Sequence, residues 1–282
     1  MPSLSQAVER AKPLLGTRVA VRVDGLSCEA AHSAIDAAFA EIAAVHALMS
    51  FHEAASDVSR LNRQAHLGPV LVDERTYEVL RRAQSVSAAS DGIFDITVAP
   101  QLVLRTLLPQ PEGASTPDGT ATWRDIALLP GGRVFFGRPL WIDLGGIAKG
   151  YAVDRTVENL LAFAPSQICV NAGGDLRVAG CEDERVALDT GHDDLVGVPV
   201  VEISDGSLAS SNGRAHIDTR NDAGCSARRF VSVMAPSCMD ADALTKIVIA
   251  LGADSAPSLL RFGACALLYE EDTGWQKVAG FA

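Results

Sequence analysis

The sequence predicts an α+β fold, with mixed sheets and flanking helices, rather than a doubly wound Rossmann sheet. Helical and strand patterns are mixed along the chain without a strict strand–helix–strand repeat, which disfavours a parallel sheet. The G-x-G-x-x-G fingerprint of a dinucleotide-binding domain is absent. The chain has 282 residues, 48% of them hydrophobic, and shows neither an internal repeat nor a long linker. We therefore expect a single domain over residues 1–282.

The first half of the chain predicts one strand, two helices and a loop. Thr17–Val23 alternates between apolar and other residues, as a half-buried strand does. Glu29–Met49 is rich in alanine and carries apolar residues at helical spacing. Asp73–Ala89 has the pattern of a second helix, with Asp73 as its N-cap. Leu108–Thr122 contains three prolines and few large apolar residues, so we expect a surface loop there.

Short strands predominate from Trp123 onwards, with two helices among them. The helices are expected over Tyr151–Phe163, directly after a glycine-rich motif, and over Ala241–Leu251. The strands, each a short and largely apolar run, are expected at Ile126–Leu129, Arg133–Phe136, Leu140–Leu144, Gln167–Asn171, Asp175–Ala179, Arg185–Leu188, Val198–Ile203, Phe230–Met234, Ala264–Tyr269 and Trp275–Val278. The last two are expected to form a hairpin.

Charge and cysteine content exclude several classes of function. The formal net charge is −11, and no dense cluster of Lys and Arg is visible, so we expect no nucleic-acid partner. The six cysteines are scattered and none forms C-x-x-C, which argues against the usual zinc and redox sites. The first ten residues lack the apolar core of a signal peptide, and no run of about 18 apolar residues predicts a transmembrane segment. We therefore expect a cytoplasmic protein with reduced thiols.

The most informative motif is Ile142–Asp154, in which a carboxylate, two adjacent glycines, a lysine and a third glycine precede a helix. Glycine lets the backbone approach a ligand closely, and its N–H groups can bind an anion. Lys149 adds a positive charge beside them, so the motif predicts a phosphate-bearing ligand. It is not a P-loop, because Lys149 precedes Gly150 and Tyr151 stands where Ser or Thr would be.

The chain has five clusters that contain glycine or asparagine, the Ile142–Asp154 motif among them. Taken in order, these clusters resemble those of the ApbE-type flavin transferases, which are FAD:protein FMN transferases. The resemblance runs from Leu15-Gly16-Thr17 to about Gly252. Its most specific parts are MSFHEAASDVSRLN, DGIFDITVAP, IDLGGIAKGYAVD, NAGGDL and CMDADAL. The resemblance implies an α+β fold with its own flavin-binding domain. It also implies that FAD is split at its pyrophosphate, that FMN passes to a threonine hydroxyl of an acceptor flavoprotein, and that AMP leaves.

The resemblance also implies site residues. Asp242 matches a ligand of a divalent metal, usually Mg²⁺, and Gly146 matches the residue whose backbone carbonyl completes that metal site. Lys149, Asp242 and the candidate base His216 form the catalytic set, since histidine accepts a hydroxyl proton near neutral pH. The residues expected to contact the flavin substrate are Leu15, Gly16, Thr17, His52, Ile93, Phe94, Asp95, Asp143, Lys149, Gly173, Gly174, Ser211 and Ile217.

Each assignment has an ordinary structural alternative. Lys149 is also consistent with a solvated surface lysine, and Asp143 is also consistent with a residue that forms a turn at the end of a strand. Phe94 is equally consistent with the core, and Asp242 with a helix N-cap or first-turn residue. His216 is as consistent with a surface loop as with a catalytic base.

The chain departs from the family pattern at four places. Leu15 replaces a methionine, a conservative change against an apolar ring. His52 replaces a tyrosine, which offers a wider stacking face. The segment around His216 is one residue short and lacks Pro and Thr-Gly, after a turn expected at Ser210–Asn212. Lys246 replaces the threonine ligand four residues after Asp242, and a protonated lysine cannot bind Mg²⁺. This substitution predicts weak metal dependence or none.

Two other functions remain open on the sequence. In an FAD pyrophosphatase, water would replace the acceptor threonine and give FMN and AMP. In a non-catalytic FAD-binding protein, the altered metal and base segments would have lost the chemistry while the fold persisted.

Overall fold

The computed structural model describes residues 7–188, 198–213 and 229–280. Contacts divide the chain into two compact units. Of the described residues, unit 1 comprises 7–43, 149–188, 198–213 and 229–280, and unit 2 comprises Ala44–Ala148. The single domain expected over residues 1–282 stays a prediction.

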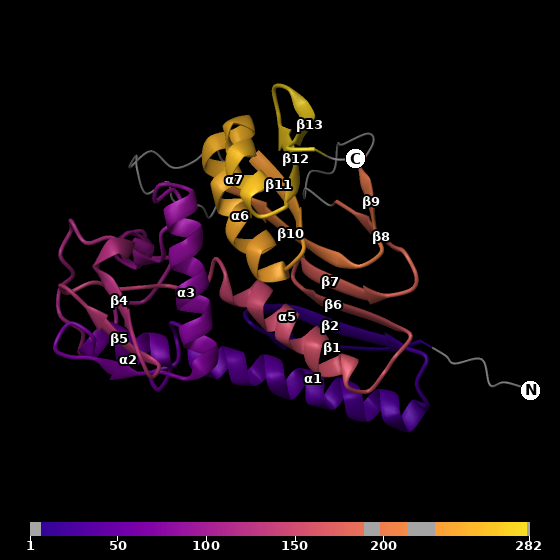
Figure 1. Ribbon diagram of the computed structural model, residues 1–282, viewed down its shortest axis with the longest axis horizontal. Coiled ribbons are helices and arrows are strands. Elements are labelled where there is room, and N and C mark those ends of the chain that lie inside the picture. The colour runs from indigo at the N-terminus through magenta and orange to yellow at the C-terminus, as the bar shows by residue number, and fades with distance from the viewer. Residues whose placement is uncertain (1–6, 189–197, 214–228, 281–282) are drawn as a thin grey trace, which may run out of the picture. The chain divides into compact units, whose positions relative to one another are not determined.

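Unit 1 is built on an antiparallel sheet of eight strands in the order β1-β2-β6-β7-β10-β11-β12-β13 (Figure 1). The strands span Val8–Leu14 (β1), Thr17–Asp24 (β2), Gln167–Ala172 (β6), Asp175–Gly180 (β7), Gly206–Asn212 (β10), Arg229–Ala235 (β11), Cys265–Glu270 (β12) and Gly274–Val278 (β13). A sheet in which every neighbouring pair is antiparallel confirms the predicted α+β class and excludes a Rossmann arrangement.

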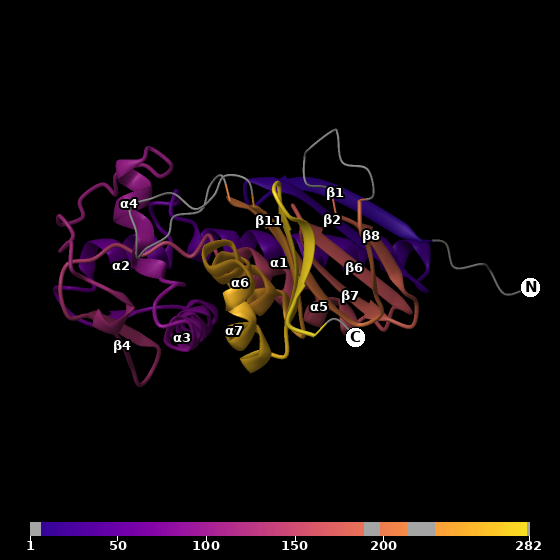
Figure 2. The same ribbon diagram turned by 90° about the horizontal axis from the view of Figure 1, so that it is seen from above.

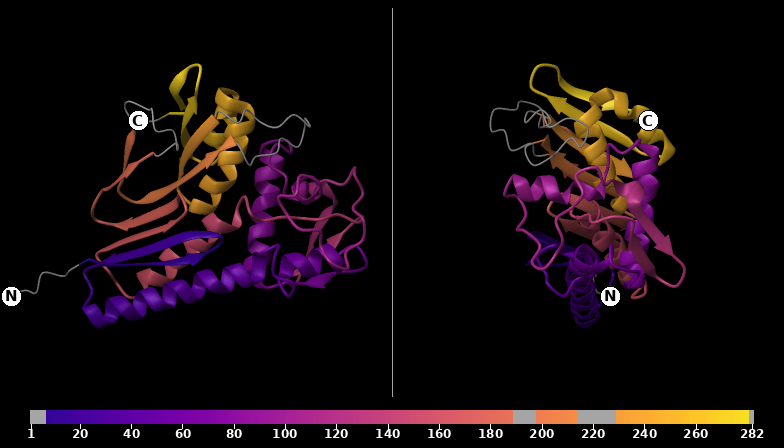
Figure 3. Two further views of the ribbon diagram at one scale, coloured as in Figure 1. Left: turned by 180° about the vertical axis from the view of Figure 1, so that it is seen from behind. Right: turned by 90° about the vertical axis from the view of Figure 1, so that its left-hand side faces the viewer.

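Helices cover one face of this sheet. They are α5 (Ala148–Leu161), α6 (Cys238–Leu251) and the part of α1 (Cys28–Met49) that belongs to unit 1. Alternate residues of β2, such as Val21, pack against Ile35 of α1 and Val157 of α5 in one buried cluster. The view from behind in Figure 3 shows α1 running alongside β1 and β2, and the ammonium of Lys12 on β1 lies 4.6 Å from the centre of the Phe39 ring.

The opposite face of the sheet packs against a separate hairpin of β8 (Glu184–Ala187) and β9 (Val200–Ile203). Leu176 and Val178 of β7 join Val201 and Ile203 of β9 in a second buried cluster. Since side chains alternate along a strand, Asp175 and Arg177 of β7 point to the helix-covered face instead. This alternation directs the charged residues of β7 toward α5 and α6.

Helix α6 is the core helix of unit 1 that carries Asp242. The hydroxyl of Ser237 caps its first turn by accepting from the N–H of Asp240 at 3.1 Å, and Gly252 ends it with a φ of +59°. A short 3₁₀ turn and α7 (Ala256–Arg261) follow, and Figure 2 shows α6 and α7 beside β11. Among the described residues, only Cys238–Arg261 is long and apolar enough to cross a membrane, and more than half of it is buried in the protein, as core helices are.

Unit 2 contains a three-stranded sheet and three further helices. The sheet has the order β3-β5-β4, with β3 at Val70–Leu71, β4 at Ile126–Leu129 and β5 at Arg133–Phe136. The helices are α2 (Asp57–Gln64), α3 (Glu74–Ala89) and α4 (Ala99–Leu104), with 3₁₀ turns at Ile96–Val98 and Trp123–Asp125. Asp73 caps α3 as predicted, accepting from the N–H of Arg75 at 3.0 Å.

Most predicted elements are confirmed with ends shifted by one to three residues, but Leu140–Leu144 is not a strand. The side-chain amide of Asn62 accepts from the N–H of Ile142 at 2.8 Å and donates to its carbonyl at 3.0 Å. The N–H of Asp143 donates to the carbonyl of Ile96 at 2.8 Å. These bonds satisfy the extended backbone without a neighbouring strand.

Two other expectations near the proposed site are wrong in detail. The helix after the glycine motif begins at Ala148, three residues earlier than predicted, so Lys149 and Gly150 lie in its first turn. The turn expected at Ser210–Asn212 is the end of strand β10, where Ser210 pairs with Ser232 of β11. Strand β10 has the sequence GSLASSN and was hard to predict, because Gly and Asn are depleted in strands generally.

Candidate active site

Four charged side chains of unit 1 form a lysine–aspartate cluster, defined here as Lys149, Asp175, Asp242 and Lys246. Lys149 lies in the first turn of α5, Asp175 begins β7, and Asp242 and Lys246 are one turn apart on α6. Two of the four, Lys149 and Asp242, are sequence-predicted site residues, and the fold brings their side chains to 3.4 Å. The predicted catalytic pair is therefore in contact.

Asp242 lies at the centre of the cluster and is fully buried. Its Oδ2 accepts from Nζ of Lys149 at 3.4 Å and from the backbone N–H of Gly150 at 3.3 Å, while its Oδ1 accepts from Nζ of Lys246 at 2.8 Å. Burial alone would raise the pKa of this carboxyl, but the two ammonium charges outweigh burial and lower it. Asp242 is therefore an ionised carboxylate at neutral pH.

Lys149 is held between two carboxylates, because its Nζ also donates to Oδ2 of Asp175 at 2.5 Å. Burial alone would lower the pKa of Lys149, but the charges of Asp242 and Asp175 raise it. Asp175 is buried, and burial together with the charge of Asp242 raises the pKa of its carboxyl. Lys149 is thus a charged ammonium, and Asp175 is a member of the cluster that was not among the predicted site residues.

A close approach of α5 and α6 creates this geometry. A Cβ on Gly150 would clash with the carbonyl oxygen of Cys238 and lie 2.8 Å from Cα of Met239. Asp154, one turn along α5, accepts from the N–H groups of Cys238 and Met239 at 2.9 and 2.8 Å, and from Arg177 at 2.8 Å. The last residue of the glycine motif therefore caps the helix that carries Asp242.

The side chains around Asp242 do not fit a Mg²⁺ ion. Mg²⁺ takes oxygen ligands in a near-octahedral arrangement. Both carboxylate oxygens of Asp242 already accept from ammonium groups, and the hydroxyl of Thr245 donates to the backbone carbonyl of Asp242 at 2.6 Å. No group of three or more His, Cys, Asp or Glu side chains that could hold a metal occurs in the described residues. Gly146, the other expected metal residue, belongs to unit 2.

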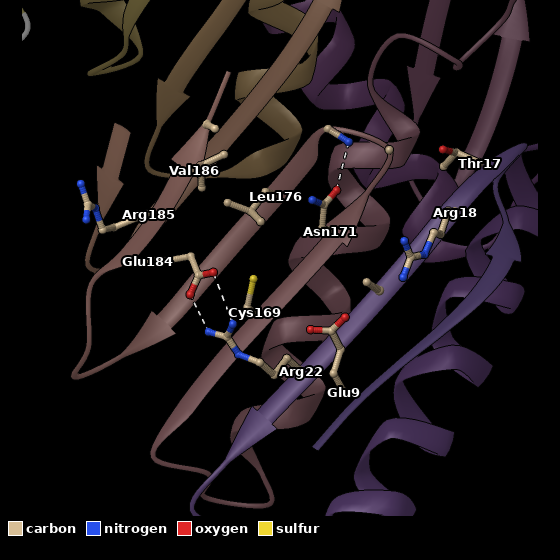
Figure 4. Close-up of a pocket in the computed structure, with 14 residues that line it drawn as sticks. Glu9, Thr17, Arg18, Arg22, Cys169, Asn171, Leu176, Glu184, Arg185 and Val186 are labelled. Atoms are coloured by element: carbon tan, nitrogen blue, oxygen red, sulfur yellow. Dashed lines mark hydrogen bonds and ion pairs between the residues drawn. The ribbon is translucent and has the colours of Figure 1, made fainter. Parts of the chain in front are cut away.

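Thr17, Gly173 and Gly174, three expected flavin contacts, lie together in unit 1. They line a pocket of about 520 Å³ on the sheet face that carries the β8–β9 hairpin (Figure 4). Gly173 and Gly174 have φ values of +65° and +102°, and a Cβ on Gly173 would clash with the hydroxyl of Thr17. The N–H of Gly174 donates to the side-chain carbonyl of Asn171 at 3.0 Å. The Asn-Ala-Gly-Gly-Asp sequence thus forms a tight turn that only glycine accommodates.

The inner part of this pocket is charged. Arg22 of β2 forms an ion pair with Glu184 of β8 at 2.5 Å, and Figure 4 shows both beside Cys169. Burial raises the pKa of the Cys169 thiol to about 11, with a further contribution from the charge of Glu184. Cys169 is therefore a neutral thiol at physiological pH.

The remaining predicted residues of unit 1 lie at turns and strand ends. Leu15 and Gly16 form the two-residue turn between β1 and β2, with φ values of +54° and +71°. Positive φ at both positions is the geometry that hairpin turns favour. Ser211 pairs with Val231 of β11.

The predicted flavin contacts of unit 2 have structural partners within that unit. Ile93 and Phe94 are buried, and Asp95 accepts from the N–H of Thr97 at 2.8 Å. The carboxylate of Asp143 accepts from the N–H of Gly145 at 3.1 Å, as a turn former does. The side chain of His52 is exposed, as a ligand-facing side chain requires. His216 and Ile217 lie outside the described residues.

The model of the ApbE family matches residues 15–268. The chain belongs to the ApbE family. Among curated proteins, the FAD:protein FMN transferase of Treponema pallidum is 27% identical over 89% of this chain and 81% of its own length. The enzyme of the same name from Haemophilus influenzae is 27% identical over 81% of this chain and 74% of its own.

Solved structures of ApbE proteins have the same fold. The ApbE protein of Thermotoga maritima superposes with a TM-score of 0.85 at 24% identity, covering 97% of both chains. The flavinyl transferase ApbE of Pseudomonas stutzeri, in its apo form, superposes with a TM-score of 0.82 at 22% identity, covering 99% of this chain and 96% of its own. The ApbE-like fold expected from the sequence is confirmed.

Proposed function

We propose that this chain is an FAD:protein FMN transferase that moves FMN from FAD to a threonine hydroxyl of an acceptor flavoprotein. Membership of the ApbE family and the names of its curated relatives support an enzyme that transfers flavin. One observation carries the proposal. Within the glycine motif, Lys149 is a permanently charged ammonium held against two buried carboxylates. This is a pre-organised positive charge of the kind that pyrophosphate cleavage requires.

The reaction is a phosphoryl-type transfer. The threonine oxygen forms a bond to the phosphorus of the FMN half, and the bond from that phosphorus to the bridging oxygen of the pyrophosphate breaks. AMP leaves with that oxygen, and the proton of the hydroxyl passes to a base. Catalysis of such transfers depends on positioning the reactants and neutralising the charge that develops on the phosphates.

The proposal gives roles to the predicted catalytic residues and to Asp175. Lys149 neutralises the pyrophosphate, and Asp242 with Asp175 keeps its ammonium charged and in place. The glycines of the motif let the protein backbone approach the ligand closely. His216 accepts the proton of the threonine hydroxyl. The role of His216 rests on the sequence resemblance alone.

Three finer points stay predictions. That the acceptor is a flavoprotein with a target threonine is implied by the resemblance alone. The resemblance also implies Mg²⁺, for which the side chains around Asp242 are a poor fit. The cytoplasmic location rests on the sequence alone.

Incubation of the purified protein with FAD tests the proposal. AMP release measured by liquid chromatography, together with covalent in-gel flavin fluorescence of an added acceptor flavoprotein, is the expected result. Free FMN without a fluorescent acceptor band would instead identify an FAD pyrophosphatase. FAD binding with no AMP under any condition would identify a non-catalytic flavin-binding protein.

A further inference from the structure

We propose that the ammonium group of Lys246 takes the place of a divalent metal ion in this protein, so that FAD cleavage here is independent of metal. This inference rests on the proposed function, because the activity assay that tests it measures FAD cleavage. The metal-binding assay that also tests it does not depend on that function. The argument comes from the contacts of Lys246 and Asp242 on α6.

Lys246 is anchored at three points in the cluster. Its Nζ lies 2.8 Å from Oδ1 of Asp242, 2.9 Å from the hydroxyl of Thr245 and 3.3 Å from the backbone carbonyl of Asp242. An ammonium group has three N–H donors, so these contacts fix the charge rather than leave it on a flexible stem. Its side chain remains 21% exposed, whereas that of Asp242 is fully buried.

The pair is not an ordinary surface ion pair on a helix. Ion pairs one turn apart on a helix are normally exposed at both ends and contribute little to stability. Here the carboxylate of Asp242 is fully buried and contacts a second ammonium, that of Lys149, through its other oxygen. Two positive charges therefore flank one buried carboxylate.

This arrangement competes directly with a metal ion. A divalent cation at Asp242 would lie beside two ammonium groups and would have to displace Lys246 from Oδ1. Asp242 and Asp175 balance the charges of Lys149 and Lys246, so the cluster has no excess negative charge to attract a cation. In this proposal a pyrophosphate oxygen takes over one N–H of each ammonium group from its present acceptor, and the two groups then stabilise the developing negative charge, which is the task that a metal ion performs in such reactions.

The metal dependence of the wild-type protein is the first test. AMP release from FAD is measured after EDTA treatment, with and without millimolar Mg²⁺. The expected result is a change of less than about twofold between the two conditions, because the resident charge supplies the neutralisation. Loss of activity in EDTA that Mg²⁺ restores would overturn the proposal.

Metal binding is measured in parallel by electron paramagnetic resonance of Mn²⁺, which needs no activity. The wild-type protein is expected to leave the spectrum of free Mn²⁺ unchanged. Stoichiometric binding of Mn²⁺ that an Asp242→Asn variant abolishes would overturn the proposal. If no AMP is released under any condition, the proposed function fails, while this assay still decides the inference.

Two substitutions of Lys246 separate its charge from its place in the fold. Lys246→Met is expected to lower FAD cleavage about 100-fold whether or not Mg²⁺ is present, as removal of one stabilising group does in other active sites. Lys246→Thr restores an oxygen ligand, and Mg²⁺ is expected to raise its activity at least about tenfold above that in EDTA. Unchanged activity of folded Lys246→Met would contradict the proposal.

Lys277→Thr is the matched control. Lys277 is an exposed lysine on β13, outside the cluster, so this variant is expected to keep wild-type activity and the same insensitivity to EDTA. Circular dichroism of every variant verifies that it is folded.

Discussion

The carboxylate of Asp154 on α5 accepts a hydrogen bond of 2.9 Å from the backbone N–H of Cys238, the first residue of α6. It also accepts from Met239 and from Arg177 of β7, so one buried side chain joins two helices and the sheet. Burial raises the pKa of this carboxyl, while the two N–H groups and Arg177 oppose the shift. The orientation of Asp242 toward Lys149 depends on this junction.

Replacing Asp154 is therefore expected to destabilise the folded protein. Asp154→Ala leaves the Arg177 charge and two N–H groups without their acceptor, and should lower the free energy of unfolding by about 3 kcal/mol. FAD cleavage should fall as well, since α6 loses its alignment. Urea denaturation measures the first effect. Asp36→Ala, which breaks an exposed ion pair with Arg10, is the control and should cost less than about 1 kcal/mol. Equal costs for the two variants would contradict this role of Asp154.

Gly150 sets the distance between α5 and α6. Gly150→Ala would force the added methyl group against the carbonyl of Cys238, and should destabilise the fold by about 1–3 kcal/mol. Gly68→Ala is the matched control, because no atom lies within 4 Å of the position of its Cβ. Thermal melting compares the two. A Gly150→Ala protein as stable as the Gly68→Ala protein would show that the helices can move apart freely.

Lys149 and Asp175 should act as one unit. Lys149→Met removes the charge between two buried carboxylates and should reduce AMP release about 100-fold or more. Asp175→Asn keeps the shape but weakens the hold on Lys149, so its loss of activity should be smaller. In the double variant the two effects should not add, because both act through the same ammonium group. Steady-state rates of AMP release test this, and additive losses would indicate independent roles.

The thiol of Cys169 should report on the pocket beside Gly173. A raised pKa means that the reactive thiolate appears only at higher pH. Labelling with iodoacetamide should therefore keep increasing about tenfold per unit of pH until near pH 11, whereas an unperturbed thiol levels off near its pKa of about 8.5. Peptide mapping by mass spectrometry follows the reaction, with the exposed Cys181 as an internal reference. A plateau at pH 9 for Cys169 would contradict the shift.

Much of the fold could be predicted because local patterns and tertiary structure agree. The long alanine-rich helix, the N-cap at Asp73 and most strands of the sheet follow from periodicity and capping residues. The errors occur where contacts distant in sequence decide the structure. Leu140–Leu144 has the composition of a strand, but Asn62 supplies its hydrogen bonds instead of a neighbouring strand.

Residue types in a fixed order were enough to identify the family and the glycine motif, and they predicted Lys149 and Asp242 as site residues. The contacts of Asp175 with Lys149, and of Asp154 with the start of α6, became apparent from the folded chain. They come from β7 and α5, and although both lie in motifs that the sequence shows, no local pattern indicates which groups they contact. Their roles arise from burial and from the close approach of α5 and α6, which brings Lys149 to 3.4 Å from Asp242, 93 residues further along the chain. Such proximity depends on how the side chains of distant segments pack together, which a short sequence pattern does not reveal.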